Sequence, residues 1–146
     1  MAENKASFSK AERDAMKERV SELKSSGKAN AAEANLADCL AKIKAMPAPD
    51  RAIATRIHEL VLKAAPELAP KTWYGMPAYA LPGKDGKVIC FFQNAGKFKV
   101  RYHTLGFSEW AKMDDGAMWP TSFAIIKLTP KIETQIKALL KQAAGI

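Results

Sequence analysis

The sequence predicts an α+β fold, in which helices cover one face of an antiparallel sheet of about four strands and a helical arm precedes the domain. Apolar residues recur at helical spacing up to about residue 64 and again after residue 129. Between these parts, Lys71 to Phe107 holds eight aromatic residues and reads as three strands joined by tight turns. Helices followed by strands and a closing helix are typical of this class.

The chain of 146 residues divides into residues 1–32, a helical arm and linker, and residues 33–146, an α+β domain. Ser9 and Glu12 form the S-x-x-E pattern of a capping box, so a helix is expected to begin there. The polar stretch 25–32 reads as a linker. The arm is expected to pack either on its own domain or on a partner chain, and the second option predicts a homo-oligomer.

Three helices are expected in the domain, over about 33–46, about 50–64 and from Pro130 onward. Asp50 is placed to cap the second of them, and Thr129 caps the third, with Pro130 in its first turn. His58 falls off the apolar stripe of its helix, so we expect it at or near the surface.

Four strands are expected, at about Trp73–Ala80, Val88–Phe92, Lys97–His103 and Phe123–Leu128. Pro77 cannot donate to a ladder, which places the first strand at an edge or Pro77 among its first residues. The second strand is apolar on both faces and is expected to be central.

The excess of positive charge lies on the strands. The net charge is +8, and residues 71–107 carry six basic groups and one acid. In the predicted strand 97–103, basic residues alternate with apolar ones, which predicts one cationic and one buried face. The cationic face consists of Lys97, Lys99, Arg101 and His103. It is a candidate phosphate site, or only the wet side of a sheet.

A second candidate is a small apolar pocket with proline-fixed rims, beside which bases or other rings could stack. The alternative is that its residues simply belong to the core. The set consists of Trp73, Tyr74, Met76, Tyr79 and Trp119.

Glu109, Asp114 and Asp115 form the one acidic cluster near the end of the predicted sheet, and they are weak candidates for metal ligands. A turn at Asp114-Asp115-Gly116 explains the two aspartates equally well. The sequence contains no glycine-rich phosphate loop and no hydrolase or zinc-protease motif, so we expect a protein that is not an enzyme.

The two cysteines lie far apart and form no C-x-x-C pair, as expected of buried thiols in a reducing cytosol. The chain shows no apolar leader and no run of apolar residues long enough to cross a bilayer. A cytoplasmic protein that does not contact membranes is therefore expected.

Two segments resemble a known family. The sequence WYGMPAY at Trp73–Tyr79, followed by a hairpin and an apolar strand, is similar to the signature of the YdhG-like domains. The sequence DDGAMWP at Asp114–Pro120, with the strand and helix after it, is similar to that family's ending. The resemblance covers about residues 33–146 and implies a frataxin-like fold. Since one or more members are described as intracellular iron chaperones, it also implies that iron is a possible ligand.

Three hypotheses about function follow for this small binding domain. The resemblance implies a frataxin-like protein that binds iron. The charge distribution favours a module that binds an anionic small molecule or nucleic acid through the cationic face. The arm favours a protein–protein assembly module.

Overall fold

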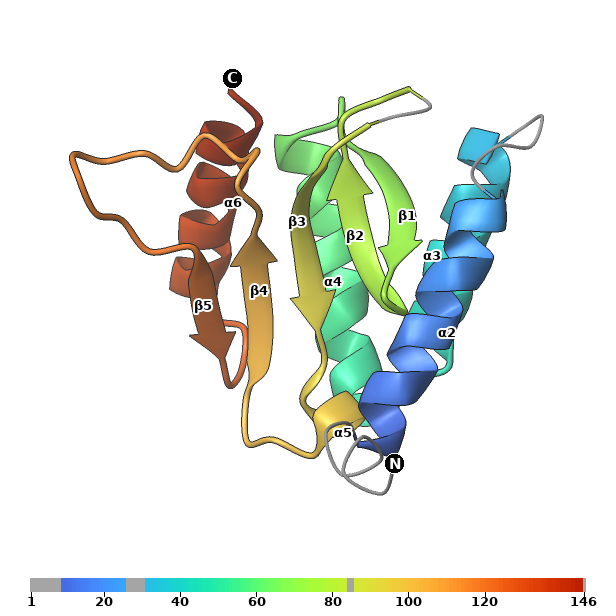
Figure 1. The fold of residues 1–146 in the computed structure, drawn as a ribbon. Coiled ribbons are helices and arrows are strands. Elements are labelled where there is room, and N and C mark those ends of the chain that lie inside the picture. Colours follow the sequence, from blue (N-terminus) through green and yellow to red (C-terminus); the bar gives the residue numbers. More distant parts are fainter. Residues whose placement is uncertain (1–8, 26–30, 84–85, 146) are drawn as a thin grey trace.

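The protein folds into a five-stranded antiparallel sheet with helices packed on one side (Figure 1). The computed structural model describes residues 9–25, 31–83 and 86–145. The elements, in chain order, are α2 (Lys10–Ser25), α3 (Ala31–Lys44), α4 (Ala48–Ala64), β1 (Ala69–Trp73), β2 (Met76–Ala80), β3 (Val88–Gln93), α5 (Ala95–Phe98), β4 (His103–Phe107), β5 (Ser122–Ile125) and α6 (Pro130–Ala144). The predicted α+β class is confirmed.

The strands follow one another across the sheet in the order β1-β2-β3-β4-β5, so each pairs with its neighbour in sequence. The expected number of four strands is wrong, because the segment Trp73–Ala80 is not one strand. It contains the end of β1, a turn at Tyr74-Gly75, and β2, which pair in the register Trp73↔Met76. The edges are β1 and β5; β2 is internal, and Pro77 is its second residue.

The turn between β1 and β2 is a two-residue hairpin turn with an unusual backbone. Tyr74 has φ 52° and Gly75 has φ 75°. Positive φ at both central residues is the property of type I′ turns, whose twist suits paired strands. Gly75 adopts this conformation without steric cost, whereas Tyr74 must be held in it by its surroundings.

The predicted strand Lys97–His103 is wrong. Lys97 and Phe98 are the last two residues of the short helix α5, which Lys99 closes in the left-handed conformation at φ 55°. The strand β4 begins only at His103. Val100 and Tyr102, which the alternating pattern placed on a buried face, are exposed.

A contact with α4 explains the helix at this position. The carboxylate of Asp50 accepts hydrogen bonds from the side-chain amide of Asn94 (2.8 Å) and from the backbone N–H of Gly96 (2.9 Å). The bond from Gly96 satisfies a backbone N–H at the start of α5. A negative charge such as that of Asp50 is favourable at this end of a helix. Asp50 therefore does not cap α4, which begins at Ala48 with no side-chain cap; the Thr129 cap of α6 is confirmed (Oγ1 to Ile132 N, 3.2 Å).

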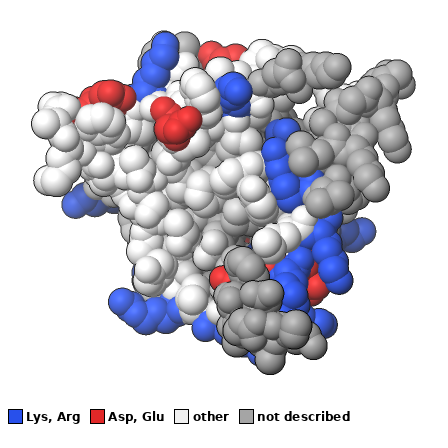
Figure 2. Space-filling model, in the orientation of Figure 1, with Lys and Arg blue, Asp and Glu red and all other residues white. Residues whose placement is uncertain are grey.

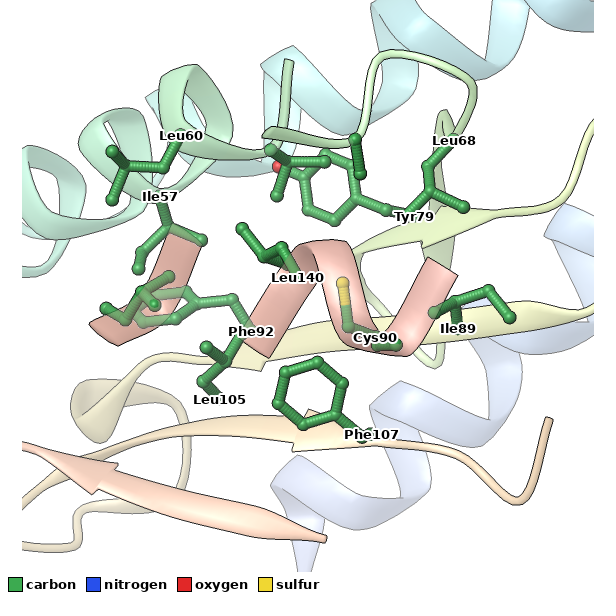
Figure 3. Packing of buried hydrophobic residues seen from close by; sticks show 14 of the residues in the cluster. Ile57, Leu60, Leu68, Tyr79, Ile89, Cys90, Phe92, Leu105, Phe107 and Leu140 are labelled. Carbon is green, nitrogen blue, oxygen red and sulfur yellow. The ribbon is translucent and has the colours of Figure 1, made fainter. Parts of the chain in front are cut away.

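The core lies between the sheet and the helices behind it (Figure 3). Ile57 and Leu60 of α4 and Leu140 of α6 point toward the strands, and each is completely buried. On the sheet, Tyr79, Cys90, Phe92, Leu105 and Phe107 face the helices. Helices therefore cover one face of the sheet, as expected.

The opposite face of the sheet is largely uncharged, with Lys and Arg at its rim (Figure 2). Phe91 lies on this face, since its neighbours Cys90 and Phe92 point into the core. Its ring covers Gly106 on β4, where an added Cβ would overlap the ring. The prediction of a cationic sheet face is thus wrong.

His58 is buried, contrary to the expectation of a place at or near the surface. Its Nδ1 shares a hydrogen bond of 2.9 Å with the hydroxyl of Tyr79. Burial lowers the pKa of His58 below its ordinary value of 6.5, an effect that Glu59 partly opposes. Burial also raises the pKa of Tyr79 well above its ordinary value.

The low pKa of His58 predicts a loss of stability in mild acid. Between the folded and unfolded pKa values the unfolded chain binds more protons, so stability is lost as the pH falls below about 6.5. Urea unfolding at several pH values between about 7.5 and 5.5 should show a falling midpoint. His58→Gln, which keeps a hydrogen-bonding side chain, should flatten this fall. An unchanged pH dependence in the variant would contradict the assignment to His58.

Candidate functional site

The N-terminal helix α2 lies on its own domain, beside β1 and α3 (Figure 1). The predicted capping box begins this helix: Ser9 N donates to Glu12 Oε1 (2.8 Å), and Glu12 N donates to Ser9 Oγ (3.1 Å). Of the two options for the arm, the structure shows packing on the same chain. Homo-oligomerisation through the arm stays a prediction.

Glu18 of α2 lies between two lysines that come from different elements. Its Oε2 contacts Nζ of Lys42 on α3, and its Oε1 lies 3.9 Å from Nζ of Lys97 on α5. Lys97 also donates a hydrogen bond of 2.9 Å to the carbonyl oxygen of Tyr74. The carboxylate is thus held over the turn between β1 and β2.

Gly75 allows this close approach. A Cβ added to it would lie 2.5 Å from Lys97 Nζ and would overlap the Glu18 carboxylate. A side chain at position 75 would therefore displace the carboxylate, quite apart from the strain of a positive φ. We call Lys42, Tyr74, Gly75 and Lys97 the turn site, and Glu18 is its occupant.

The turn site opens into a shallow hollow of about 330 Å³ between α2, α3 and α5. Asp14 and Glu18, the two acids that line it, both belong to α2. Lys42 and Lys97, the two cations, both belong to the rest of the domain. Removing α2 would leave a hollow whose described charged lining is entirely basic.

Aromatic rings adjoin the turn site on the β1 side. Tyr74 is 38% exposed, and its ring meets that of Trp73 edge-on at 4.9 Å. Trp73 in turn packs on Phe91, with ring centroids 5.2 Å apart. The guanidinium carbon of Arg19, from α2, lies 5.6 Å from the centre of the Tyr74 ring. Helix α2 therefore supplies both a carboxylate to the cations and a planar cation to the aromatic ring.

The structure separates the four residues of the predicted cationic face. Lys97 belongs to the turn site, and Lys99 is the exposed residue that ends α5. Arg101 is exposed and lies over the ring of Tyr102 at 5.4 Å. His103 is buried, stacks on Phe92 at 5.5 Å and accepts a hydrogen bond at Nδ1 from Ala95 N (2.9 Å). Only Lys97 contributes to the site.

The predicted aromatic pocket is also divided. Tyr74 belongs to the turn site and Trp73 adjoins it, while Met76 pairs with Trp73 and is buried. Tyr79 points toward the helices that cover the sheet, and it is 1% exposed. Trp119 belongs to the loop between β4 and β5, at the far side of the sheet from β1, where it packs against the core. These residues therefore do not line one pocket.

The candidate metal ligands do not fit a metal ion. Glu109, Asp114 and Asp115 are all exposed. Within residues 9–25, 31–83 and 86–145, no three His, Cys, Asp or Glu side chains are grouped so that they could hold an ion. A hard cation such as calcium needs six or more oxygen ligands at one point. The described residues therefore provide no site for the iron that the resemblance implies.

Three residues at this site were not predicted from the sequence: Glu18, Lys42 and Gly75. Gly75 had a signal, because an isolated glycine inside a strand pattern can mark a break in the strand or a close approach of the backbone. Glu18 and Lys42 had none, because each is an ordinary charged residue on a helix.

Comparison of the chain with known family models, with curated proteins and with solved structures gives no match in any of the three. The resemblance to YdhG-like domains, and with it the frataxin-like fold, stays a prediction. Among the described helices, none has the length and apolar character needed to cross a membrane.

Proposed function

We propose that this protein is a binding module for a small anionic ligand that carries a planar ring, such as a nucleotide. The turn site receives the phosphate, and the exposed ring of Tyr74 stacks on the ligand's ring. In the free protein, α2 covers both positions. The observation that carries the proposal is the Glu18 carboxylate, which two lysines from separate elements hold against Gly75.

The acids of the hollow lie on α2 and the cations on the rest of the domain, which supports a turn site where a ligand can replace Glu18. The Glu18 carboxylate between two lysines supports an anion as ligand, because cationic donors of this kind also bind phosphate groups. Only two lysines line the hollow, which suits the single phosphate of a mononucleotide better than a long nucleic acid.

The attachment of α2 is weak in its described part. No side chain from Lys10 to Arg19 belongs to the hydrophobic core, and Ala15 is the one that is buried. The Glu18 ion pairs join partly exposed side chains, and pairs at exposed positions contribute only about 0.2–1 kcal/mol each. Between Lys10 and Arg19, a ligand that replaces Glu18 therefore competes with these ion pairs and not with core packing.

Removing the charge of Glu18 should strengthen ligand binding. In Glu18→Gln, α2 loses its attraction to Lys42 and Lys97, so the covered state is less populated. We expect AMP, titrated by calorimetry, to bind up to about fivefold more tightly, since two surface pairs are worth about 1 kcal/mol. Ribose 5-phosphate, which lacks the base, should bind more weakly than AMP in both proteins.

Glu67→Gln is the matched control, because it makes the same change at an exposed acid between α4 and β1, outside the hollow. It should leave the affinity for AMP unchanged. Equal affinity in Glu18→Gln and the unmodified protein would show that α2 does not cover the site. Absence of AMP binding in every variant would refute the proposed function.

A further inference from the structure

A second cavity lies at the opposite edge of the sheet, between β5 and α6. It has a volume of about 480 Å³ and an almost wholly apolar lining, which includes Leu105, Ile125, Ile132 and Ile136. A neighbouring cavity of about 370 Å³ shares Phe123, Gln135 and Leu139 with it and extends to Gln142. The two together form one groove, which we call the α6 groove.

The α6 groove is elongated along the helix. Its helical wall runs from Ile132 to Gln142, which is about 15 Å at 1.5 Å per residue. The strand wall is β5, the edge of the sheet, which pairs with β4 alone. Branched aliphatic side chains dominate the lining, and Ile126 at the rim is 63% exposed. This shape suits a linear hydrocarbon chain better than a compact ring.

The charge that lines the groove is positive and lies near one end. Lys127 is the one charged residue among those that line the two cavities, and it lies just before the start of α6. Its ammonium makes no ion pair with any residue that the structure describes. Glu133, the acid in the first turn of α6, is bound instead by Arg56 through two hydrogen bonds of 2.8 and 3.0 Å.

A hydroxyl group also lies at the Lys127 end. Thr129 lines the larger cavity there, while Gln135 lines both cavities. The hydroxyl oxygen of Thr129 accepts from Ile132 N, so its own hydrogen remains to be donated to another acceptor. An apolar groove with one cation and hydrogen-bond donors at its end is the arrangement that holds a chain with an anionic head.

We propose that the α6 groove binds a single-chain aliphatic carboxylate, with the carboxylate at Lys127 and the hydrocarbon chain between β5 and α6. This site is independent of the turn site, which lies at the other edge of the sheet, so either proposal can fail without the other.

The test is calorimetric titration of the full chain with sodium octanoate and sodium decanoate, both kept below their micelle-forming concentrations. Each buried methylene should raise the affinity about fourfold, so decanoate should bind at least about tenfold more tightly than octanoate. Lys127→Glu should weaken decanoate binding by at least tenfold. Lys131→Glu, the same charge change at an exposed residue outside the groove, should have an effect of less than about twofold.

A second variant tests the groove itself without altering the core. Gln135 is exposed and lines both cavities, so Gln135→Trp should fill the groove and abolish decanoate binding while the protein stays folded. Absence of binding to either acid, equal affinity for both, or full binding by Lys127→Glu would overturn the proposal. It would also be overturned by a chain that sediments as a dimer and becomes a monomer in Gln135→Trp, since a second copy would then occupy the groove.

Discussion

Reversing both cations of the turn site, in the double variant Lys42→Glu, Lys97→Glu, is expected to lower the affinity for AMP by about a hundredfold or more. A hydrogen bond to a charged group contributes about 1.5–3 kcal/mol, and two of them give a hundredfold or more. Glutamates at these positions would also repel the phosphate. Both lysines are partly exposed, so the fold should tolerate the change.

The double variant Lys99→Glu, Arg101→Glu is the matched control, because it makes the same change of charge at residues outside the turn site. It should lower the affinity only slightly and lose that effect in added salt. A larger loss in this control than in the first double variant would contradict the turn site. It would mean that the ligand binds the segment 97–103, as the sequence pattern indicated. Urea unfolding of both variants would show that neither loss reflects unfolding.

Phe92→Ala is expected to cause the largest loss of stability. Phe92 is 1% exposed, lies in the central strand and stacks on the buried ring of His103. Removing a buried phenyl ring costs about 3–5 kcal/mol through lost burial and the cavity left behind. For a chain of this size, that loss corresponds to a fall in Tm of about 6–20 °C.

Tyr102→Ala provides the comparison by thermal unfolding. The alternating pattern placed Tyr102 on a buried face with Phe98 and Val100, but it is 36% exposed and contacts Arg101. Its removal should cost about 1 kcal/mol or less. Equal losses in the two variants would mean that residues 97–103 form a strand after all, contrary to the structure.

The helices and the central strand were predictable because their patterns are local and repeated. The closing helix has a Thr129 cap, a proline in its first turn and apolar residues at a spacing of three and four, and all three features are present in α6. The strand at Val88–Phe92 is apolar on both faces, and β3 is indeed the central strand.

The failures occurred where a distant contact or an uncommon backbone decides the structure. The alternation of residues 97–103 predicted a strand, but Asp50, far away in the sequence, binds Asn94 and Gly96 and stabilises α5. Tyr74 in a left-handed conformation split the predicted first strand into β1 and β2. Neither effect can be deduced from local periodicity.

The candidate site was only partly predictable for the same reason. Trp73, Tyr74 and Lys97 were identified from aromatic and basic clustering, and all three lie at or beside the turn site. Lys42 and Glu18 reach the site through the packing of α2 and α3, which the sequence does not specify. The pairing of an acid on the arm with cations on the domain became visible only in three dimensions.

The most direct test of the central claim is nuclear magnetic resonance of the ¹⁵N-labelled Glu18→Gln protein titrated with AMP. If the ligand binds at the turn, the backbone amides of Gly75 and Lys97 and the indole of Trp73 should show saturable shifts. The same titration of the Lys42→Glu, Lys97→Glu protein should leave these signals in place. Saturable shifts confined to Lys99–Tyr102, or no saturable shift in any part of the chain, would contradict an anion-binding site at the turn.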